Sequence, residues 1–248
     1  FAMVVLEKPL SQVYEEIDMV TTPAGKPVAM VHCNNCTNEI NAWAGIFQGF
    51  LEELGQKVGM GPILDAMFHA ALSGDKDGGG TVLYNFLSGE PVAGLTAGRP
   101  LLARTVDAKF TFANFARVQL YSALASLKLG LDILNREEVA LDRLLGHGGY
   151  FKAPEAGQRV LAAAAKAPVS VMETAGEGGP WGMALLASYA ARREPGQSLE
   201  DYLDSRIFAG QKAVTINPDP EDAAGFDAFM ERYVAALPAE RAAVDNLN

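Results

Sequence analysis

The chain has 248 residues, 49% of them hydrophobic and 20% charged, which is ordinary for a globular protein and argues against a disordered one. Its formal charge of −10 and the lack of a lysine and arginine cluster exclude a nucleic-acid backbone as the expected partner. No apolar run reaches the roughly 18 residues that span a membrane, and the start FAMVVLEKPL lacks the basic region of a signal peptide. We therefore expect a cytoplasmic protein that does not bind a membrane.

The first 32 residues are expected to form strands. The runs 2–6 and 28–32 are apolar and β-branched, residues 13–20 alternate imperfectly, and 22–27 form a turn. This pattern predicts an antiparallel meander. Because Phe1 already lies in an apolar run, we expect the chain to be a piece of a longer polypeptide.

Cys33 and Cys36 form a CxxC pair, a spacing that occurs in redox sites and in half of a zinc site. A structural zinc site needs four ligands, and His32, His69 and His147 do not have the spacing of a second pair. We therefore predict free thiols and no bound metal.

Helices are predicted next. Thr37 is placed to cap a long helix whose apolar residues recur at helical spacing and form one stripe, which is typical of core. Gly55 to Gly61 ends that helix, and Pro62 begins another that runs to Leu72. The residues of the stripe are Ile40, Trp43, Ile46, Phe47, Phe50, Leu51 and Leu54.

Residues 73–80, SGDKDGGG, are expected to form a loop. Three glycines in a row suit a phosphate cradle, but no Lys-Ser/Thr pair and helix follow, which favours a flexible turn. A strand at 81–87 then leads to Ser88-Gly89-Glu90, and residues 110–134 are predicted to form a helix.

The stretch 144–188 alternates apolar runs, glycine turns and helical segments. An apolar run ends at Gly146, the turn with Gly148 and Gly149 follows, and Pro154 begins an alanine-rich helix. The run Pro168–Met172 is followed by a glycine turn and a helix at 181–191. A strand, glycine turn and helix bring backbone N–H groups together on a ligand. The alternation predicts a mixed α/β fold with helices flanking the sheet.

The last segments are short helices and a tail. Ser198 with Asp201 is typical of a capped short helix, and Pro220 to Leu237 is predicted as a final amphipathic helix, with residues 238–248 as a frayed tail. No GxSxG, HExxH or Walker A motif is present, and no pair of carboxylates identifies a general acid and base.

Three stretches in order resemble the C-terminal half of the FGGY carbohydrate kinases, in particular xylulokinase-like and ribulokinase-like members. They are TVLYNFLSGE at 81–90, the helix at 115–134, and 146–188 with its glycine turn, helix, strand and second helix. The resemblance covers nearly the whole chain, residues 1–248. It implies a ribonuclease H-like domain of the actin and hexokinase type, which binds ATP with Mg²⁺ opposite a sugar-binding domain.

The resemblance also implies site residues. Gly148 and Gly149 match glycines whose backbone lies against the adenosine, Lys152 and Ala153 fall near the adenine, and Asn38 matches the other wall of the nucleotide pocket. In the family, the catalytic aspartate and the Gly-Thr phosphate turn lie just before the strand that begins here. No catalytic residue or metal ligand is therefore expected within this chain.

Two other readings stay open at the level of sequence. One is an actin-like or kinase-derived module that binds a nucleotide or a protein without catalysis, and the other is an unrelated α/β domain that uses the Cys33–Cys36 pair for redox chemistry. The leading reading is the nucleotide-binding half of an ATP-dependent kinase for a ketopentose, with its N-terminal domain as partner. Whether it forms a homodimer is left open.

Overall fold

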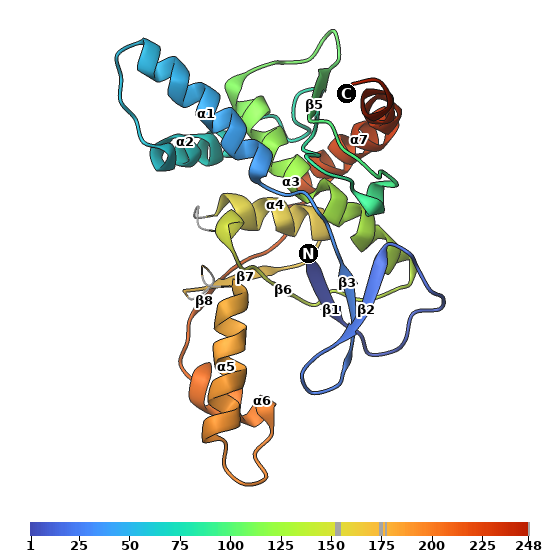
Figure 1. The fold of residues 1–248 in the computed structure, drawn as a ribbon, viewed down its shortest axis with the longest axis vertical. Coiled ribbons are helices and arrows are strands. Elements are labelled where there is room, and N and C mark those ends of the chain that lie inside the picture. Colours follow the sequence, from blue (N-terminus) through green and yellow to red (C-terminus); the bar gives the residue numbers. More distant parts are fainter. Residues whose placement is uncertain (152–154, 174–175, 177, 248) are drawn as a thin grey trace.

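A computed structural model describes residues 1–151, 155–173, 176 and 178–247. It confirms the mixed α/β class: strands, helices and short helical turns alternate along the chain (Figure 1). Among these residues, no helix is long and apolar enough to cross a membrane. The alanine-rich helix starts at Ala156, and Pro154, predicted as its first residue, lies outside the described residues.

The strands form three small sheets rather than one. β1 (Ala2–Val5), β2 (Ile17–Thr21) and β3 (Pro27–Val31) make the predicted antiparallel meander, in the order β1-β3-β2. Val4 pairs with Ala29, and Ile17 pairs with Val31. All four of these side chains are buried on the face that meets the helices.

The other two sheets contain strands that the sequence did not predict. β4 (Thr81–Tyr84) pairs antiparallel with β5 (Leu101–Arg104). In the third sheet β6 (Leu144–Leu145) runs parallel to β7 (Val169–Met172), which pairs antiparallel with β8 (Ala213–Ile216). β5 (LLAR) and β8 (AVTI) were missed because each is only four residues long, too short for its apolar residues to show a strand period, although both are mostly apolar in sequence.

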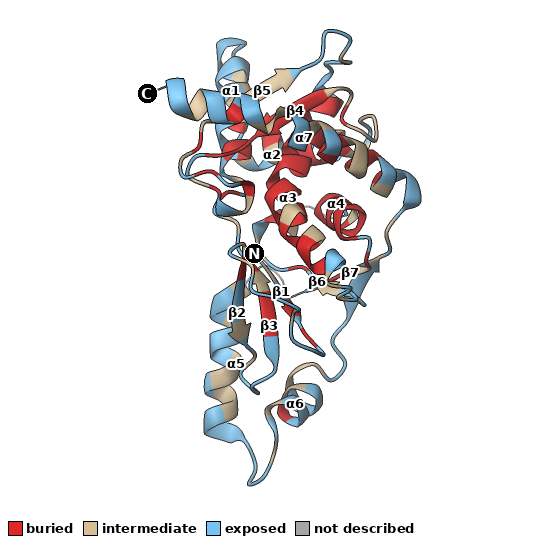
Figure 2. Cartoon of the chain, turned by 90° about the vertical axis from the view of Figure 1, so that its right-hand side faces the viewer, coloured by how far each residue is buried: buried red, intermediate tan, exposed pale blue. Residues whose placement is uncertain are grey.

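Two helices form the centre of the core. α3 (Phe112–Arg136) and α4 (Ala156–Ala165) bury nearly every residue (Figure 2). Alanines at 162, 163 and 164 allow α4 to lie close to both α3 and α7 (Pro220–Asn246), because a methyl group takes little room. α2 (Met60–Leu72) packs against α3 and also contacts α4.

α1 (Asn38–Glu53) follows the predicted helix but buries only part of the apolar stripe. Ile40 is buried, and the rings of Trp43 and Phe47 meet Phe115 of α3 edge-on, with centroids 4.8 and 5.8 Å apart. Ile46, Phe50 and Leu54 are exposed instead. The expectation that the whole stripe is core is therefore wrong at these three positions. α2 packs along α1 and the Phe115 ring of α3 meets it, but among the described residues nothing buries the exposed side chains. The Thr37 side chain makes no capping hydrogen bond either.

α7 extends beyond the predicted helix. It continues through Pro238 to Asn246, so the expected frayed tail is helical as far as Asn246. Buried Glu240 explains the continuation, since its carboxylate accepts the backbone N–H of Arg99 at 2.8 Å. Earlier in α7, Tyr84 of β4 donates its hydroxyl to the Tyr233 carbonyl at 2.5 Å.

The remaining helices form an arm. α5 (Gly178–Arg192) has no buried residue among those described, and Figure 1 shows it projecting from the body together with α6 (Leu199–Tyr202). A π-helical turn, η3 (Leu203–Ile207), follows α6. Ser198 caps α6 as predicted, accepting the Asp201 N–H at 3.0 Å. The two helices are joined where the hydroxyls of Ser188 and Tyr202 meet at 2.7 Å.

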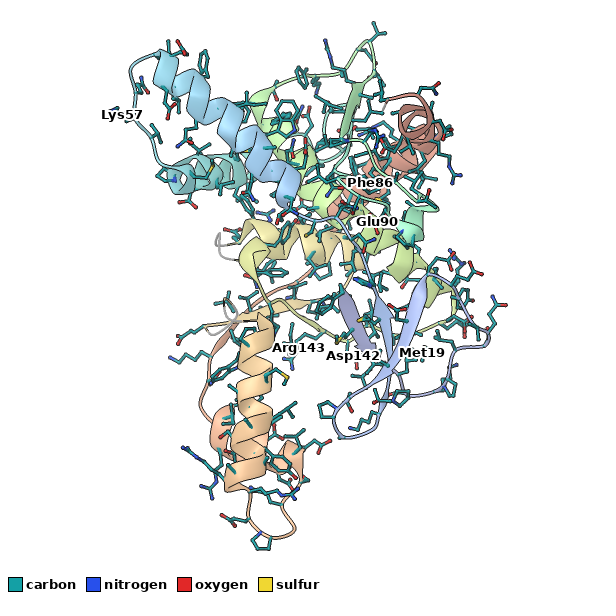
Figure 3. All side chains as sticks on the ribbon, in the orientation of Figure 1. Met19, Lys57, Phe86, Glu90, Asp142 and Arg143 are labelled. Atoms are coloured by element: carbon teal, nitrogen blue, oxygen red, sulfur yellow. The ribbon has the colours of Figure 1, made fainter. Side chains whose placement is uncertain are left out.

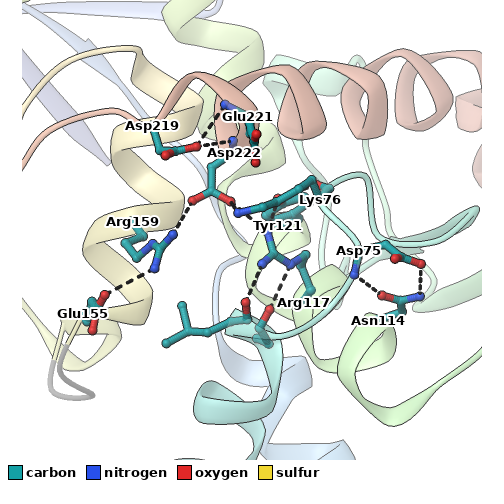
Figure 4. Close-up of polar contacts among 12 residues, drawn as sticks. Asp75, Lys76, Asn114, Arg117, Tyr121, Glu155, Arg159, Asp219, Glu221 and Asp222 are labelled. Atoms are coloured by element: carbon teal, nitrogen blue, oxygen red, sulfur yellow. Dashed lines mark hydrogen bonds and ion pairs between the residues drawn. The ribbon is translucent and has the colours of Figure 1, made fainter.

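A buried ion cluster joins α7 to the core (Figure 4). The Asp222 carboxylate accepts Lys76 Nζ at 2.5 Å, Arg159 Nη2 at 2.9 Å and Arg117 Nη1 at 3.4 Å. Arg117 also donates to the carbonyls of Ala71 and Leu72, which end α2. One carboxylate thus links α2, α3, α4 and α7. Burial opposes the charge of Asp222, but the hydrogen bonds from Lys76 and Arg159 outweigh it and lower its pKa.

Candidate functional site

The glycine pair after β6 presents bare backbone. Gly148 has φ of +99°, and a Cβ added at Gly148 or Gly149 would meet no atom of the described residues within 4 Å. By contrast, a Cβ at Gly146 would lie 2.8 Å from the Phe151 ring, and one at Gly157 would lie 2.4 Å from the Tyr150 carbonyl. The neighbouring glycines are therefore needed for packing, whereas Gly148 and Gly149 face open space.

Tyr150 fixes this turn to the core. It belongs to the short helical turn η2 (Gly149–Phe151), is buried, and donates its hydroxyl to the Leu120 carbonyl of α3 at 3.0 Å. Its ring packs edge-on against Phe68 of α2 and against Phe151. Burial raises the pKa of the Tyr150 hydroxyl well above its usual value. The glycine pair, half-buried at Gly148 and exposed at Gly149, is thus fixed to the core, which suits close approach of its backbone to a flat ligand.

Asn38 is the first residue of α1 and is exposed. The first N–H groups of a helix have no partner within it, and the Thr37 side chain does not cap them. This helix start therefore keeps donors available for a ligand, as expected for one wall of a nucleotide site. The other two predicted site residues, Lys152 and Ala153, lie outside the described residues, so the structure does not bring the full predicted set together.

Cys33 and Cys36 flank the turn that precedes α1, and neither is in a disulfide. Burial and then the charge of Glu90 raise the pKa of Cys33 to about 12. The described residues contain no group of three or more histidine, cysteine or acidic side chains that could hold a metal. A thiol with a raised pKa is a weak nucleophile, which disfavours redox chemistry here. The absence of metal stays a prediction.

The glycine loop at 73–80 serves packing. Gly78, Gly79 and Gly80 all have positive φ, and a Cβ at Gly79 would lie 2.2 Å from the amide nitrogen of Asn114. Asn114 Oδ1 accepts the Asp75 N–H at 2.6 Å, and its Nδ2 donates to the Lys109 carbonyl at 2.8 Å. These contacts hold the loop against α3, which differs from the expected flexible turn. That the loop does not bind phosphate stays a prediction.

A hollow of about 600 Å³ beside this loop is lined by both signs of charge and by none of the predicted site residues. Its acidic side chains are offset by basic ones: Arg232 pairs with Asp77 at 3.0 Å, and Lys109 pairs with Asp75 at 3.4 Å. Side chains that already pair with one another offer no net charge to a ligand. We therefore place the candidate site at the Gly148–Gly149 turn and the start of α1.

Sequence reasoning missed one residue near this site. Figure 3 shows Glu90 beside the chain that joins β3 to α1. Its side chain is 0% exposed and accepts backbone N–H groups of that connection. The sequence marked Ser88-Gly89-Glu90 only as part of a family pattern. No local signal indicates its partners, which lie 55 and 56 positions away in the chain.

The fold and the open glycine turn define a nucleotide-site candidate on an actin-type α/β domain. Residues 1–191 match the FGGY family of carbohydrate kinases, C-terminal domain. Because this match covers more than half of the chain, the protein belongs to that family, as its sequence resemblance predicted. No curated protein sequence matches the chain significantly.

Solved kinases share the fold. The chain superposes on xylulose kinase from Lactobacillus acidophilus with a TM-score of 0.73 at 15% identity, over 99% of this chain and 46% of that one. Gluconate kinase from the same organism matches at 0.70 and 16%, over 96% and 44%. Plasmodium falciparum glycerol kinase with ADP matches at 0.52 and 13%, over 88% and 39%. The chain thus spans less than half the length of these kinases, and at such identities the likeness shows the fold alone.

Proposed function

We propose that this chain is the nucleotide-binding half of an ATP-dependent sugar kinase, and that the sugar is a ketopentose such as xylulose or ribulose. Family membership supports a carbohydrate kinase. Xylulose, gluconate and glycerol kinases all share the fold, so the structural neighbours do not select a sugar. The choice of sugar therefore rests on the sequence resemblance and is the finer part of the proposal.

The open backbone of Gly148 and Gly149 carries the nucleotide assignment. The adenosine is proposed to lie against this pair, with Lys152 and Ala153 near the adenine. The start of α1 at Asn38 is proposed as the opposite wall, since its free N–H groups suit a polar ligand. When bound, ATP supplies the phosphoryl group, and these residues bind and orient it.

The catalytic base, the phosphate turn and the sugar contacts are proposed to lie in a partner domain outside these 248 residues. The described part of the chain contains no cluster of three or more metal-ligating side chains, so we assign no Mg²⁺ ligand to it. Phosphoryl transfer depends mostly on positioning and on stabilisation of charge around Mg²⁺. Both parts of the proposed enzyme are therefore needed for turnover.

Gly149→Val tests the nucleotide site. Gly149 does not have a positive φ and faces open space, so the free protein accommodates the valine while the side chain fills the proposed base position. We expect the wild-type chain to bind ADP weakly, because association must first overcome several kcal/mol of lost freedom. Isothermal calorimetry should detect no ADP binding by the variant.

The matched control is Gly182→Val on α5, another glycine without positive φ and with no neighbour within 4 Å. It should bind ADP as the wild type does. Unchanged ADP affinity in the Gly149 variant would show that the nucleotide does not contact this turn.

A further inference from the structure

We propose that Glu90 is a positioning residue for the wall of the nucleotide site at Asn38: it holds the turn Cys33–Cys36 from which α1 starts. This inference rests on the proposed function, because it concerns a wall of that site. Asn38 follows Asn35 by three residues, so a shift of the turn is passed directly to the start of the helix.

Both oxygens of the Glu90 carboxylate accept hydrogen bonds from the turn. One oxygen accepts the backbone N–H of Asn34 at 3.2 Å. The other accepts the backbone N–H of Asn35 at 3.1 Å and the Asn35 side-chain amide at 3.1 Å. A fully buried carboxylate is costly unless its oxygens accept hydrogen bonds, and removing it would leave these donors of the turn without their acceptor. The charge is therefore best explained by the geometry it imposes on two consecutive N–H groups.

The turn holds the Glu90 segment in return. Asn35 Oδ1 accepts the backbone N–H groups of Leu87 at 2.9 Å and Ser88 at 3.2 Å. Asn34 Nδ2 donates to the Gly89 carbonyl at 2.8 Å. These contacts run in both directions between the same two short segments. Reciprocal hydrogen bonds between two segments stabilise one another cooperatively.

Each segment is also fixed to the rest of the molecule. The Glu90 N–H donates to the Leu95 carbonyl at 2.9 Å, and a Cβ on Gly89 would lie only 2.5 Å from the Thr96 carbonyl oxygen. On the side of the turn, Asn85, which follows β4, donates its amide to the Cys36 carbonyl at 2.6 Å. The start of α1 is therefore tied to the segment after β4 in two ways, directly through Asn85 and through the contacts of Glu90 with the turn.

Glu90→Gln tests the positioning role of Glu90, because the N–H₂ group of the glutamine would face donors of the turn instead of accepting hydrogen bonds from them. The matched control is Glu137→Gln. Glu137 also accepts three donors, two from Ser11 and one from Tyr14, but far along the chain from α1. ADP affinity is measured by calorimetry, and alkylation of Cys33 and Cys36 by iodoacetamide is followed by mass spectrometry.

We expect Glu90→Gln to weaken ADP binding roughly tenfold, as the loss of a charge-assisted hydrogen bond would, and to speed alkylation of both thiols. Glu137→Gln should change neither quantity. Unchanged ADP affinity in Glu90→Gln, with or without faster alkylation, would overturn the positioning role. Gly149→Val decides the nucleotide site separately, since it leaves the turn before α1 untouched.

Circular dichroism establishes whether Glu90→Gln folds. If it does not, Asn34→Ala replaces it, because this change removes only the bond to Gly89 and keeps both backbone bonds to Glu90. A smaller loss of ADP affinity with faster alkylation is then expected, and no change in either would overturn the proposal.

Discussion

At Asp222 a single buried carboxylate offsets three cations. Arg117 is buried with it, whereas Lys76 and Arg159 are partly exposed. Removing one member of such a cluster leaves a charge without a partner in a place where water reaches it poorly. Loss of one member of the cluster should therefore lower stability because it leaves a buried charge without a partner.

Asp222→Asn should lower the free energy of unfolding by about 3 kcal/mol, as expected when a buried ion pair loses one partner. Urea denaturation followed by circular dichroism measures the change. Glu155→Gln is the control, because Glu155 pairs with the same Arg159 at 3.3 Å but is exposed, and exposed pairs contribute about 0–1 kcal/mol. Equal effects of the two substitutions would contradict this account of the cluster.

Asp222 also makes the stability of the fold depend on pH. The pKa of Asp222 is lower in the folded chain than its ordinary value of 3.8, so the folded state favours the ionised form. Its stabilisation is present above the ordinary pKa and is lost as pH falls through the lowered one. The difference in unfolding free energy between wild type and Asp222→Asn should therefore shrink in acid. A difference that stayed constant from about pH 7 to below about pH 3 would be inconsistent with it.

At the scale of elements, α4 depends on small side chains. It lies against α2, α3 and α7, and its alanines are almost fully buried. Gly157 allows the Tyr150 carbonyl to approach where a Cβ would lie 2.4 Å away. The alanine-rich composition that marked this helix in the sequence is thus required by its neighbours on several sides.

Ala162→Leu should destabilise the chain by about 1–3 kcal/mol, because a larger side chain at a fully buried position forces its neighbours to move. The midpoint of urea unfolding measures this. Ala190→Leu on α5 is the control, since that position is exposed, and it should change stability by no more than about 0.5 kcal/mol. If Ala162→Leu were as stable as the control, α4 would not be close-packed as described.

At the scale of the whole molecule, the chain corresponds to less than half of the kinases whose fold it shares. We expect the chain alone to show no sugar-dependent ADP release above background in a coupled assay with Mg-ATP and a ketopentose. A general base contributes on the order of 10² to 10⁴ in rate, and positioning by the partner domain contributes more. A polypeptide that joins the partner domain to this chain should turn over, whereas turnover by the chain alone would place a catalytic carboxylate within it.

Local pattern predicted much of this architecture. The meander at the N-terminus, the helices predicted near Thr37, Phe110 and Pro154, and the strand that ends at Met172 are confirmed, with the third helix starting at Ala156, because each has its own apolar period. The ordered glycine turn and helices also carried the family resemblance, which the match over residues 1–191 confirms. Such features depend on neighbours within a few residues, and a sequence displays those directly.

Only the tertiary structure decided what depends on distant partners. The outer face of α1 is exposed at Phe50 because no described element covers it. The helix α7 continues beyond Pro238, where the Glu240 carboxylate accepts the backbone N–H of Arg99. The contact between Glu90 and Asn35 joins segments 55 positions apart. Such hydrogen bonds and such burial form between segments that are distant in sequence. The apolar periodicity of either segment does not indicate which other segment it will contact.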